Sequence, residues 1–172
     1  MKISQLLSDK SIKPKEKTQA LSNLLLCGDI SLADLTAFAE NAKDAVKATC
    51  IESIEFATKQ QASILDKQTF EFVVKSMTAK APRIKWESAK VIGNTAHLFT
   101  DMLDTAIVNL LINSEHVGTV VRWSAAFALG EILKLKTKHN KMLLPLIESI
   151  VRREEKGSIK KIYAAALKKI EK

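Results

Sequence analysis

The sequence predicts an all-α fold in which about four similar helix pairs stack into one superhelical solenoid. Three observations support this prediction: turn-forming residues are few, one motif recurs at a nearly constant interval, and apolar residues are spaced as on helix faces. Five glycines and three prolines in 172 residues are too few for the many turns of a β-sandwich or a doubly wound α/β fold. The apolar fraction of 47% and the charged fraction of 27% are ordinary for globular proteins, which excludes disordered and collagen-like classes.

The repeated motif opens with a β-branched residue and a basic residue, and it continues through small and apolar positions. Its four copies begin at Val46, Ile84, Val121 and Ile159, at intervals of 38, 37 and 38 residues. Such a period indicates stacked helical units that bury their apolar faces against one another. The third copy is the most regular, with the sequence VRWSAAFALG over residues 121–130.

Another amphipathic helix is expected before each copy, because apolar residues there recur every three or four positions. These helices are predicted around residues 32–38, 70–77, 103–111 and 143–151. We therefore expect a single domain over residues 1–172, with repeats at approximately 30–61, 66–99, 101–136 and 140–172. Residues 1–28, with a helix from Pro14 to Cys27 that ends at Gly28, are expected to cap the first repeat.

Local signals predict several helix boundaries. Ser31 and Ser158 are placed as N-cap residues, whose hydroxyls can accept hydrogen bonds from the first turn. Pro82 is placed at the first position of a helix, where its missing N–H costs nothing. Gly157 is expected to end the helix before Ser158.

The third copy of the motif resembles the second helix of a HEAT repeat, an armadillo-type α-α unit also found in bacterial HEAT-like repeat proteins. The resemblance rests on the Val121-Arg122 pair, the two alanines that follow and the closing Leu129-Gly130. It implies a right-handed α-α superhelix whose second helices line the concave wall. It also explains Pro145 inside a predicted helix, because first helices of that family often bend at such a proline.

The basic residue of each copy forms a ladder of equivalent positions. In HEAT proteins this position usually bonds to neighbouring turns, so the resemblance favours a structural role over ligand binding. The ladder consists of Lys47, Lys85, Arg122 and Lys160.

Positive charge is concentrated at the C-terminal end of the chain. Residues 134–172 contain twelve Lys or Arg against four Glu, which accounts for the whole net charge of +8. Such a surface can attract an acidic partner or a phosphate backbone, although lysine richness is also a common compositional bias.

No apolar run is long enough for a signal peptide or a membrane span. Cys27 and Cys50 lack metal-like spacing and are expected to be small buried side chains in a reducing compartment. The sequence therefore predicts a cytoplasmic protein without a metal or cofactor.

A candidate binding stripe follows from projecting the four second helices at about 100° per residue. With the β-branched residue of each copy at zero, positions −1, +2, +6, +9 and +13 point away from the core. Gly93 and Gly130 occupy +9 in copies two and three. The candidate partner-binding residues on this stripe are Arg83, Trp86, Lys90, His97, Trp123, Phe127, Lys134, Lys161 and Lys168.

The two tryptophans, Trp86 and Trp123, occupy the same position of adjacent copies, and two interpretations remain open. They form an exposed aromatic patch for a partner, or they fill the seam between successive repeats. Glu52 and Glu55 lie one helical turn apart on the groove side of the first copy. We interpret them as ordinary exposed helix residues rather than as an acid–base pair.

Catalytic signatures are absent from the sequence: the three histidines have no metal-ligand spacing, and no phosphate-binding or nucleophile motif occurs. We therefore expect a non-catalytic scaffold that binds a protein or peptide, with an acidic partner as one candidate. Nucleic-acid binding is the alternative, as in HEAT-like DNA glycosylases, although the groove positions of copies two to four contain no carboxylate. A lyase role, as in HEAT-like bilin lyases, has no supporting residue. Oligomeric state is not predicted.

Overall fold

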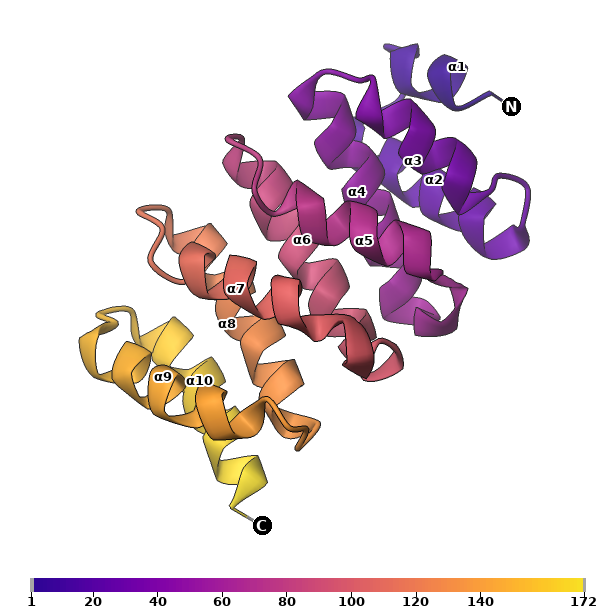
Figure 1. The fold of residues 1–172 in the computed structure, drawn as a ribbon. Helices are drawn as coiled ribbons and strands as arrows, with labels where there is room; N and C mark the ends of the chain where they lie inside the picture. The colour runs from indigo at the N-terminus through magenta and orange to yellow at the C-terminus, as the bar shows by residue number, and fades with distance from the viewer. Residues whose placement is uncertain (1, 172) are drawn as a thin grey trace.

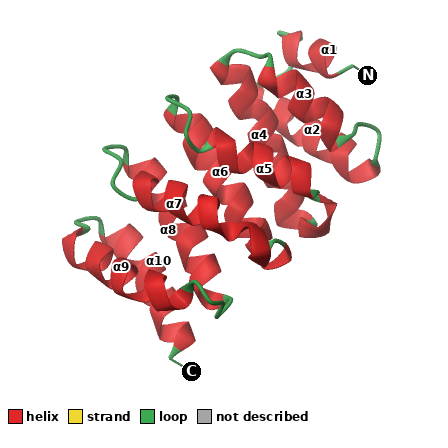
Figure 2. Ribbon diagram, viewed as in Figure 1, coloured by secondary structure: helices red, strands yellow, loops and turns green. Residues whose placement is uncertain are grey.

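The computed structural model describes residues 2–171, so the predictions that reach Met1 and Lys172 lie outside it. These residues form helices joined by short loops and contain no strand (Figure 2). Helix pairs follow one another in a single row with the two chain ends at opposite ends (Figure 1). The all-α solenoid prediction is confirmed.

Each of the four predicted repeats contains a first helix and a second helix. The first helices are α3 (Leu32–Glu40), α5 (Lys67–Ser76), α7 (Leu103–Asn113) and α9 (Asn140–Arg153). The second helices are α4 (Asp44–Gln60), α6 (Pro82–Thr95), α8 (Thr119–Lys134) and α10 (Gly157–Ile170). Short 3-10 turns at Ala62–Ile64, Ala96–Leu98 and Thr100–Met102 complete the connections after α4 and α6.

The second helices form the inner side of the stack. Neighbouring second helices contact one another along their lengths, whereas neighbouring first helices make far fewer contacts. A row that is tighter on one side curves toward that side, so α4, α6, α8 and α10 form the concave wall. Small residues such as Ala125, Ala126 and Ala128, all fully buried, let these helices approach closely.

The N-terminal segment contains the short α1 (Ile3–Ser8) and the longer α2 (Pro14–Cys27). Helix α2 packs against α4 in the same way that α4 packs against α6. Its Leu21 and Leu25 are buried in the continuous core. The segment therefore extends the row of second helices by one member, and it covers the end of the first repeat.

Several predicted boundaries are confirmed. The Ser31 hydroxyl accepts a hydrogen bond from the Asp34 N–H at 3.0 Å, and Pro82 is the first residue of α6. Gly28 ends α2 with a φ of 78°, in the left-handed region that favours glycine. Helix α9 continues through Pro145.

The predicted boundary before the last helix is wrong by a few residues. Helix α9 ends at Arg153, and α10 begins at Gly157 after Lys156. Gly157 therefore opens α10, and Ser158 is inside the helix instead of capping it. The prediction for the cysteines is half right, since Cys50 is buried but Cys27 is exposed. Burial raises the pKa of the Cys50 thiol to about 12.

No helix among the described residues is both long and apolar enough to cross a bilayer. Within residues 2–171, no group of three or more His, Cys, Asp or Glu side chains is placed to hold a metal ion.

Candidate functional site

A pocket of about 420 Å³ opens on the concave wall where α4, α6 and α8 meet. It brings four residues of the predicted stripe together: Trp86, Lys90, Trp123 and Phe127. The other lining residues are Glu55, Phe56, Lys59, Asn94, Val120 and Ser124. Three repeats thus contribute to one site.

Both tryptophans line this pocket rather than being sealed in the core. Trp123 is 40% exposed, and Trp86 is half-buried on the neighbouring helix. The ring of Trp123 stacks on Phe127 one turn later, with centroids 6.2 Å apart and an interplanar angle of 16°. The pocket therefore has exposed aromatic faces on one side of the groove.

Phe127 also packs against the backbone of the preceding repeat. A Cβ added to Gly93 would lie 2.3 Å from Cε1 of Phe127, so the ring occupies space that only glycine leaves free. Gly130 is similarly covered by Ala166 of α10, although at an ordinary 3.4 Å. In copies two and three the +9 position thus lies in a buried seam, and the expectation that Gly93 and Gly130 face the groove is wrong.

Trp86 is held in place by a buried carboxylate. Its Nε1–H donates to Oε1 of Glu87 at 2.8 Å, and the Lys90 ammonium donates to the other oxygen of Glu87 at 2.8 Å. Glu87 is only 3% exposed. Since both of its oxygens are engaged, this carboxylate orients the indole and the ammonium.

Glu55 of α4 completes this cluster, and its interpretation as an exposed helix residue is wrong. It is 5% exposed, and its carboxylate lies 3.7 Å from the Lys90 ammonium. Helix α6 packs over this part of α4, which places Lys90 on Glu55 just as Phe127 lies on Gly93 one repeat later. The carboxylate is one wall of the pocket.

Burial and neighbouring charges shift the pKa values of both Glu55 and Lys90. Burial raises the pKa of the Glu55 carboxyl, and the charge of Glu87 raises it further, against the opposing effect of Lys90. Burial alone would lower the pKa of the Lys90 amine. The carboxylates of Glu87, Glu55 and Glu52 stabilise the ammonium more strongly than burial destabilises it, so the pKa is raised. Lys90 thus remains a cation that is already neutralised by its neighbours.

Arg83 is engaged in a separate contact farther toward the N-terminus. Its guanidinium donates to Glu52 at 2.7 Å, and Glu52 also accepts from the Thr18 hydroxyl of α2 at 2.9 Å. Asn94 ties α6 to α4 by donating to the Glu55 carbonyl at 3.3 Å. These bonds join three successive second helices on the groove side.

The remaining stripe residues lie outside the pocket. His97 is exposed in a 3-10 turn beyond the end of α6, and Lys134 pairs with Glu131 in its own helix. Lys161 and Lys168 are exposed on α10, and no ion pair between described residues involves them. The groove therefore changes from neutral and aromatic at repeats two and three to basic at repeat four.

The ladder residues make different contacts in each repeat. The Lys47 ammonium lies 5.2 Å from the centre of the Phe72 ring, which is a cation–π distance. The Lys85 ammonium donates to the Met77 carbonyl and to the side-chain oxygen of Asn113, each at 3.2 Å. Lys160 is half-buried, and its ammonium forms no hydrogen bond with another described residue.

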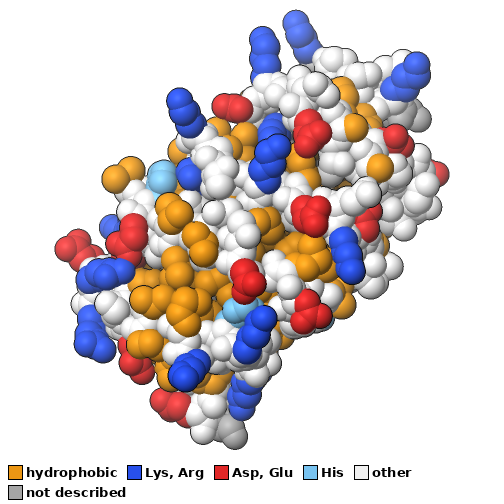
Figure 3. All heavy atoms as spheres, viewed as in Figure 1, with side chains coloured by type: hydrophobic (Ala, Val, Ile, Leu, Met, Phe, Trp, Pro, Cys, Tyr) orange, Lys and Arg blue, Asp and Glu red, His pale blue; other side chains and the backbone are white. Residues whose placement is uncertain are grey.

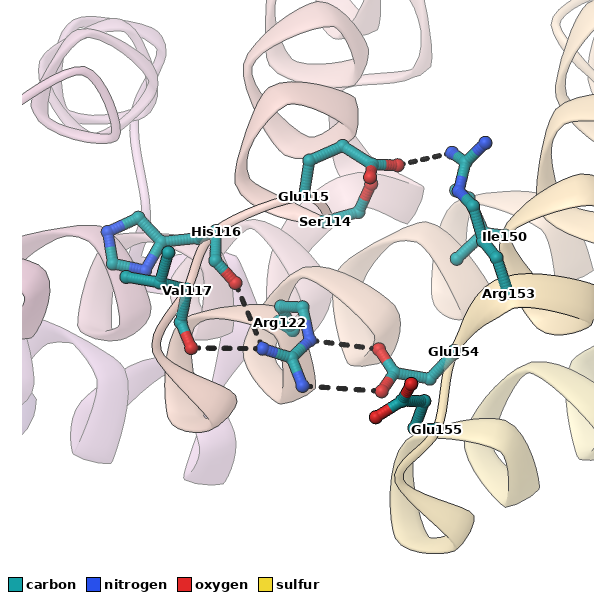
Figure 4. Close-up of a pocket in the computed structure, with 9 residues that line it drawn as sticks. All are labelled: Ser114, Glu115, His116, Val117, Arg122, Ile150, Arg153, Glu154 and Glu155. Atoms are coloured by element: carbon teal, nitrogen blue, oxygen red, sulfur yellow. Dashed lines mark hydrogen bonds and ion pairs between the residues drawn. The ribbon is translucent and has the colours of Figure 1, made fainter.

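Arg122 is the best-anchored member of the ladder (Figure 4). Its guanidinium donates to Glu154 at 2.9 Å and 3.3 Å, and to the carbonyls of His116 and Val117 at 3.0 Å and 3.1 Å. Burial opposes ionisation of Glu154, but the bonds from Arg122 and the Lys156 N–H keep the pKa of that carboxyl below its usual value. A cavity of about 320 Å³ lies beside this contact.

Sequence reasoning missed the buried carboxylates and the polar lining of the pocket. The signal for Glu87 was present, since it lies between Trp86 and Lys90 on one turn. Phe56, Asn94 and Ser124 fall off the projected stripe, so only the packing of the helices reveals them.

No protein-family model matches the chain, and no curated protein does. Solved structures match it along nearly its whole length. A designed armadillo repeat protein in complex with peptide (KR)4 has a TM-score of 0.75 at 19% identity, over 97% of this chain and 80% of that chain. Computationally designed armadillo repeat proteins for modular peptide recognition match with a TM-score of 0.76 at 16% identity, over 97% and 80% of the two chains.

A natural protein complex also has a similar fold. The structure of CpcE and CpcF of phycocyanin lyase from Nostoc sp. PCC7120 matches with a TM-score of 0.67 at 15% identity, over 96% of this chain and 97% of that chain. Identities this low establish the architecture alone. The chain has the α-α superhelical fold of armadillo and HEAT-type repeat proteins.

Proposed function

We propose that the protein is a non-catalytic binding module that holds an extended peptide segment of a partner protein along its concave groove. The observation that carries the proposal is the pocket where Trp86, Trp123 and Phe127 meet. Aromatic side chains in partly desolvated pockets are the commonest sites of strong binding energy at protein interfaces. A volume of about 420 Å³ accommodates one large apolar side chain of a peptide with part of its backbone.

The polar lining supports a peptide as the ligand. Lys59 and Asn94 also line the pocket, and neither of them is fully buried. Such side chains can form hydrogen bonds with the backbone of a bound peptide. The peptide-bound and peptide-recognition designs with the same fold add a precedent for a ligand on such a solenoid.

The basic end of the groove supports acidic residues beyond the anchor. Lys161 and Lys168 are exposed on α10, whereas Arg83 and Lys90 are already paired with carboxylates. A peptide with an apolar anchor at Trp123 and carboxylates toward α10 would match both parts of the groove. The same lysines make a nucleic-acid backbone the second candidate ligand.

Binding of library peptides tests the proposal. Peptides are selected on the wild-type protein, and their affinities are measured by fluorescence polarisation. Trp123→Ala is expected to weaken binding at least tenfold, because truncating a central aromatic anchor costs about 2 kcal/mol or more. Val117→Ala, which shortens a 93% exposed apolar side chain outside the pocket, should leave affinity unchanged.

Two outcomes would contradict peptide binding in the groove. In the first, Trp123→Ala binds every selected peptide as tightly as the wild type does. In the second, short DNA or RNA binds at low salt, loses affinity steeply as salt rises and fails to bind K161E/K168E, while no peptide binds. The second result would establish the nucleic-acid alternative instead.

A further inference from the structure

The convex side of the solenoid carries an exposed apolar surface over α7 and α9 (Figure 3). Figure 3 shows this side, with hydrophobic atoms gathered over these two helices of repeats three and four. The exposed apolar side chains are Val108 (55%), Ile112 (63%), Met142 (47%) and Leu146 (39%). Between the two helices, Leu111, Leu146 and Ile150 line a shallow cavity of about 140 Å³. We call this surface the α7/α9 trough.

The repeat itself does not require apolar residues at these positions. Thirty-seven residues before Val108 and Ile112, the exposed positions of α5 are Glu71 and Lys75. A polar outer face is therefore compatible with the same packing of a first helix. An apolar face that is continuous across two helices indicates a protein interface rather than a necessity of the fold.

A polar contact closes the trough at one end, and an ion pair closes it at the other. At the start of the helices, Nδ1 of His139 lies 3.5 Å from the Asp104 carboxylate. At their ends, Arg153 pairs with Glu115. The apolar surface is thus bounded by a polar rim, as interface patches usually are.

The two helices that form the trough differ in charge. From Asp101 to the loop after α7, the exposed charged residues are all acidic, namely Asp101, Asp104 and Glu115, and the sequence has no Lys or Arg between Lys90 and Arg122. From Lys138 to the end of α9 they are mainly basic, namely Lys138, Lys141, Arg152 and Arg153, with Glu148 as the one acidic residue. An acidic side and a mainly basic side on one apolar patch make that patch complementary to itself.

We propose that the α7/α9 trough is the interface of a symmetric homodimer. A two-fold axis in the plane of the trough, parallel to α7 and α9, places α7 of each copy over α9 of the other. The starts of these helices then coincide, so the Asp101 and Asp104 edge of one copy faces the Lys138 and Lys141 edge of the other. Closed two-fold dimers are the commonest protein oligomers, and they require this self-complementarity.

This arrangement is independent of peptide binding. The trough is formed by first helices, and the pocket is formed by second helices on the other side of the solenoid. Dimerisation would cover the exposed apolar side chains and leave two grooves open on opposite outer sides.

A charge-swap experiment tests the dimer. Molar mass is measured by light scattering and sedimentation at about 100 µM protein, where a dimer of micromolar Kd is formed, in salt near the physiological range. The wild type should have twice the chain mass. Asp104→Lys and Lys141→Asp should each raise the dimer Kd by about tenfold or more, because like charges then face each other twice.

Mixing the two variants separates an interface effect from misfolding. The pair D104K and K141D restores opposite charges at both contacts, so the mixture should form a heterodimer, whereas misfolded chains would not recover. Glu71→Lys on α5, outside the trough, and Trp123→Ala in the groove are the matched controls and should remain dimeric. A monomeric wild type, single variants that stay dimeric or a dimer broken by W123A would each overturn the proposal.

Discussion

Gly93 and Gly130 occupy the same position of successive repeats, but they face different neighbours. Phe127 covers Gly93 so closely that an added Cβ would lie 2.3 Å from its ring, whereas Gly130 leaves 3.4 Å to Ala166. The first glycine thus lets an aromatic ring enter the seam and form the floor of the pocket. The second permits close packing of two helices without being strictly required for it.

Substitution of these two glycines should therefore have opposite effects. Gly130→Ala should stabilise the protein by up to about 1 kcal/mol, because alanine favours the helix and its Cβ fits. Gly93→Ala should destabilise it by about 1 kcal/mol, because overpacking against Phe127 exceeds the helix gain. Urea unfolding measures both changes.

Gly93→Ala is also expected to displace the ring of Phe127, and this displacement can be measured separately. Phe127 stacks on Trp123, so its displacement should change the tryptophan emission spectrum of the folded protein. Equal stability and identical emission for Gly93→Ala and the wild type would contradict the assigned role of this contact.

At the scale of elements, the loop after α7 and the loop after α9 are connected by Arg122 and Glu154 (Figure 4). Glu154→Gln should destabilise the protein by about 1 to 2 kcal/mol at neutral pH, because charge-assisted hydrogen bonds are lost. Glu155→Gln, at an exposed neighbour, is the control and should have little effect.

The same contact predicts a dependence on pH. The pKa of Glu154 is lowered in the folded protein from an ordinary value of 4.5, so its ionised form favours folding. This contribution is complete above the unfolded value and disappears as pH falls through the folded pKa. The stability difference between wild type and E154Q should narrow below about pH 4.5. A constant difference from pH 7 to pH 3 would contradict the assignment.

At the scale of the whole molecule, the stack is linear, and the extensive contacts of each helix pair are with its neighbours. Helices α4, α6 and α8 have a second helix packed on both sides, whereas α10 has one on a single side. In such arrays local stability depends on the number of neighbouring interfaces. Inner repeats should therefore open less often than the terminal ones.

Hydrogen exchange followed by mass spectrometry can test this gradient. Amide protection should be highest in α6 and α8 and should decline toward α1 and α10. The measurement is repeated on Asp104→Lys, in which any protection that dimerisation adds to α9 should be lost. Uniform protection along the chain would contradict a nearest-neighbour description and would indicate one cooperative unit.

The sequence by itself determined the helices and their stacking. Apolar spacing of three or four residues is a local property of a helix face. The interval of 37 or 38 residues arises because each repeat needs the same apolar positions to pack against its neighbours. Both patterns can therefore be recognised in the sequence alone. The placement of Trp86 and Trp123 on adjacent helices followed from the same periodicity. The helix boundary at Gly157 was predicted wrongly, because glycine is compatible with either end of a helix.

Only the tertiary structure decided which of these residues are exposed to solvent, which are buried in the core and which contact one another. Glu55 and an ordinary surface glutamate look alike in sequence, and Glu55 is buried because α6 packs over it and supplies Lys90. Conversely, Val108 and Ile112 resemble core residues in the sequence, but both are exposed on the outer face of α7. Burial depends on which neighbouring helix covers a position, which is a relation between segments distant in the chain, so a single helix pattern does not contain it.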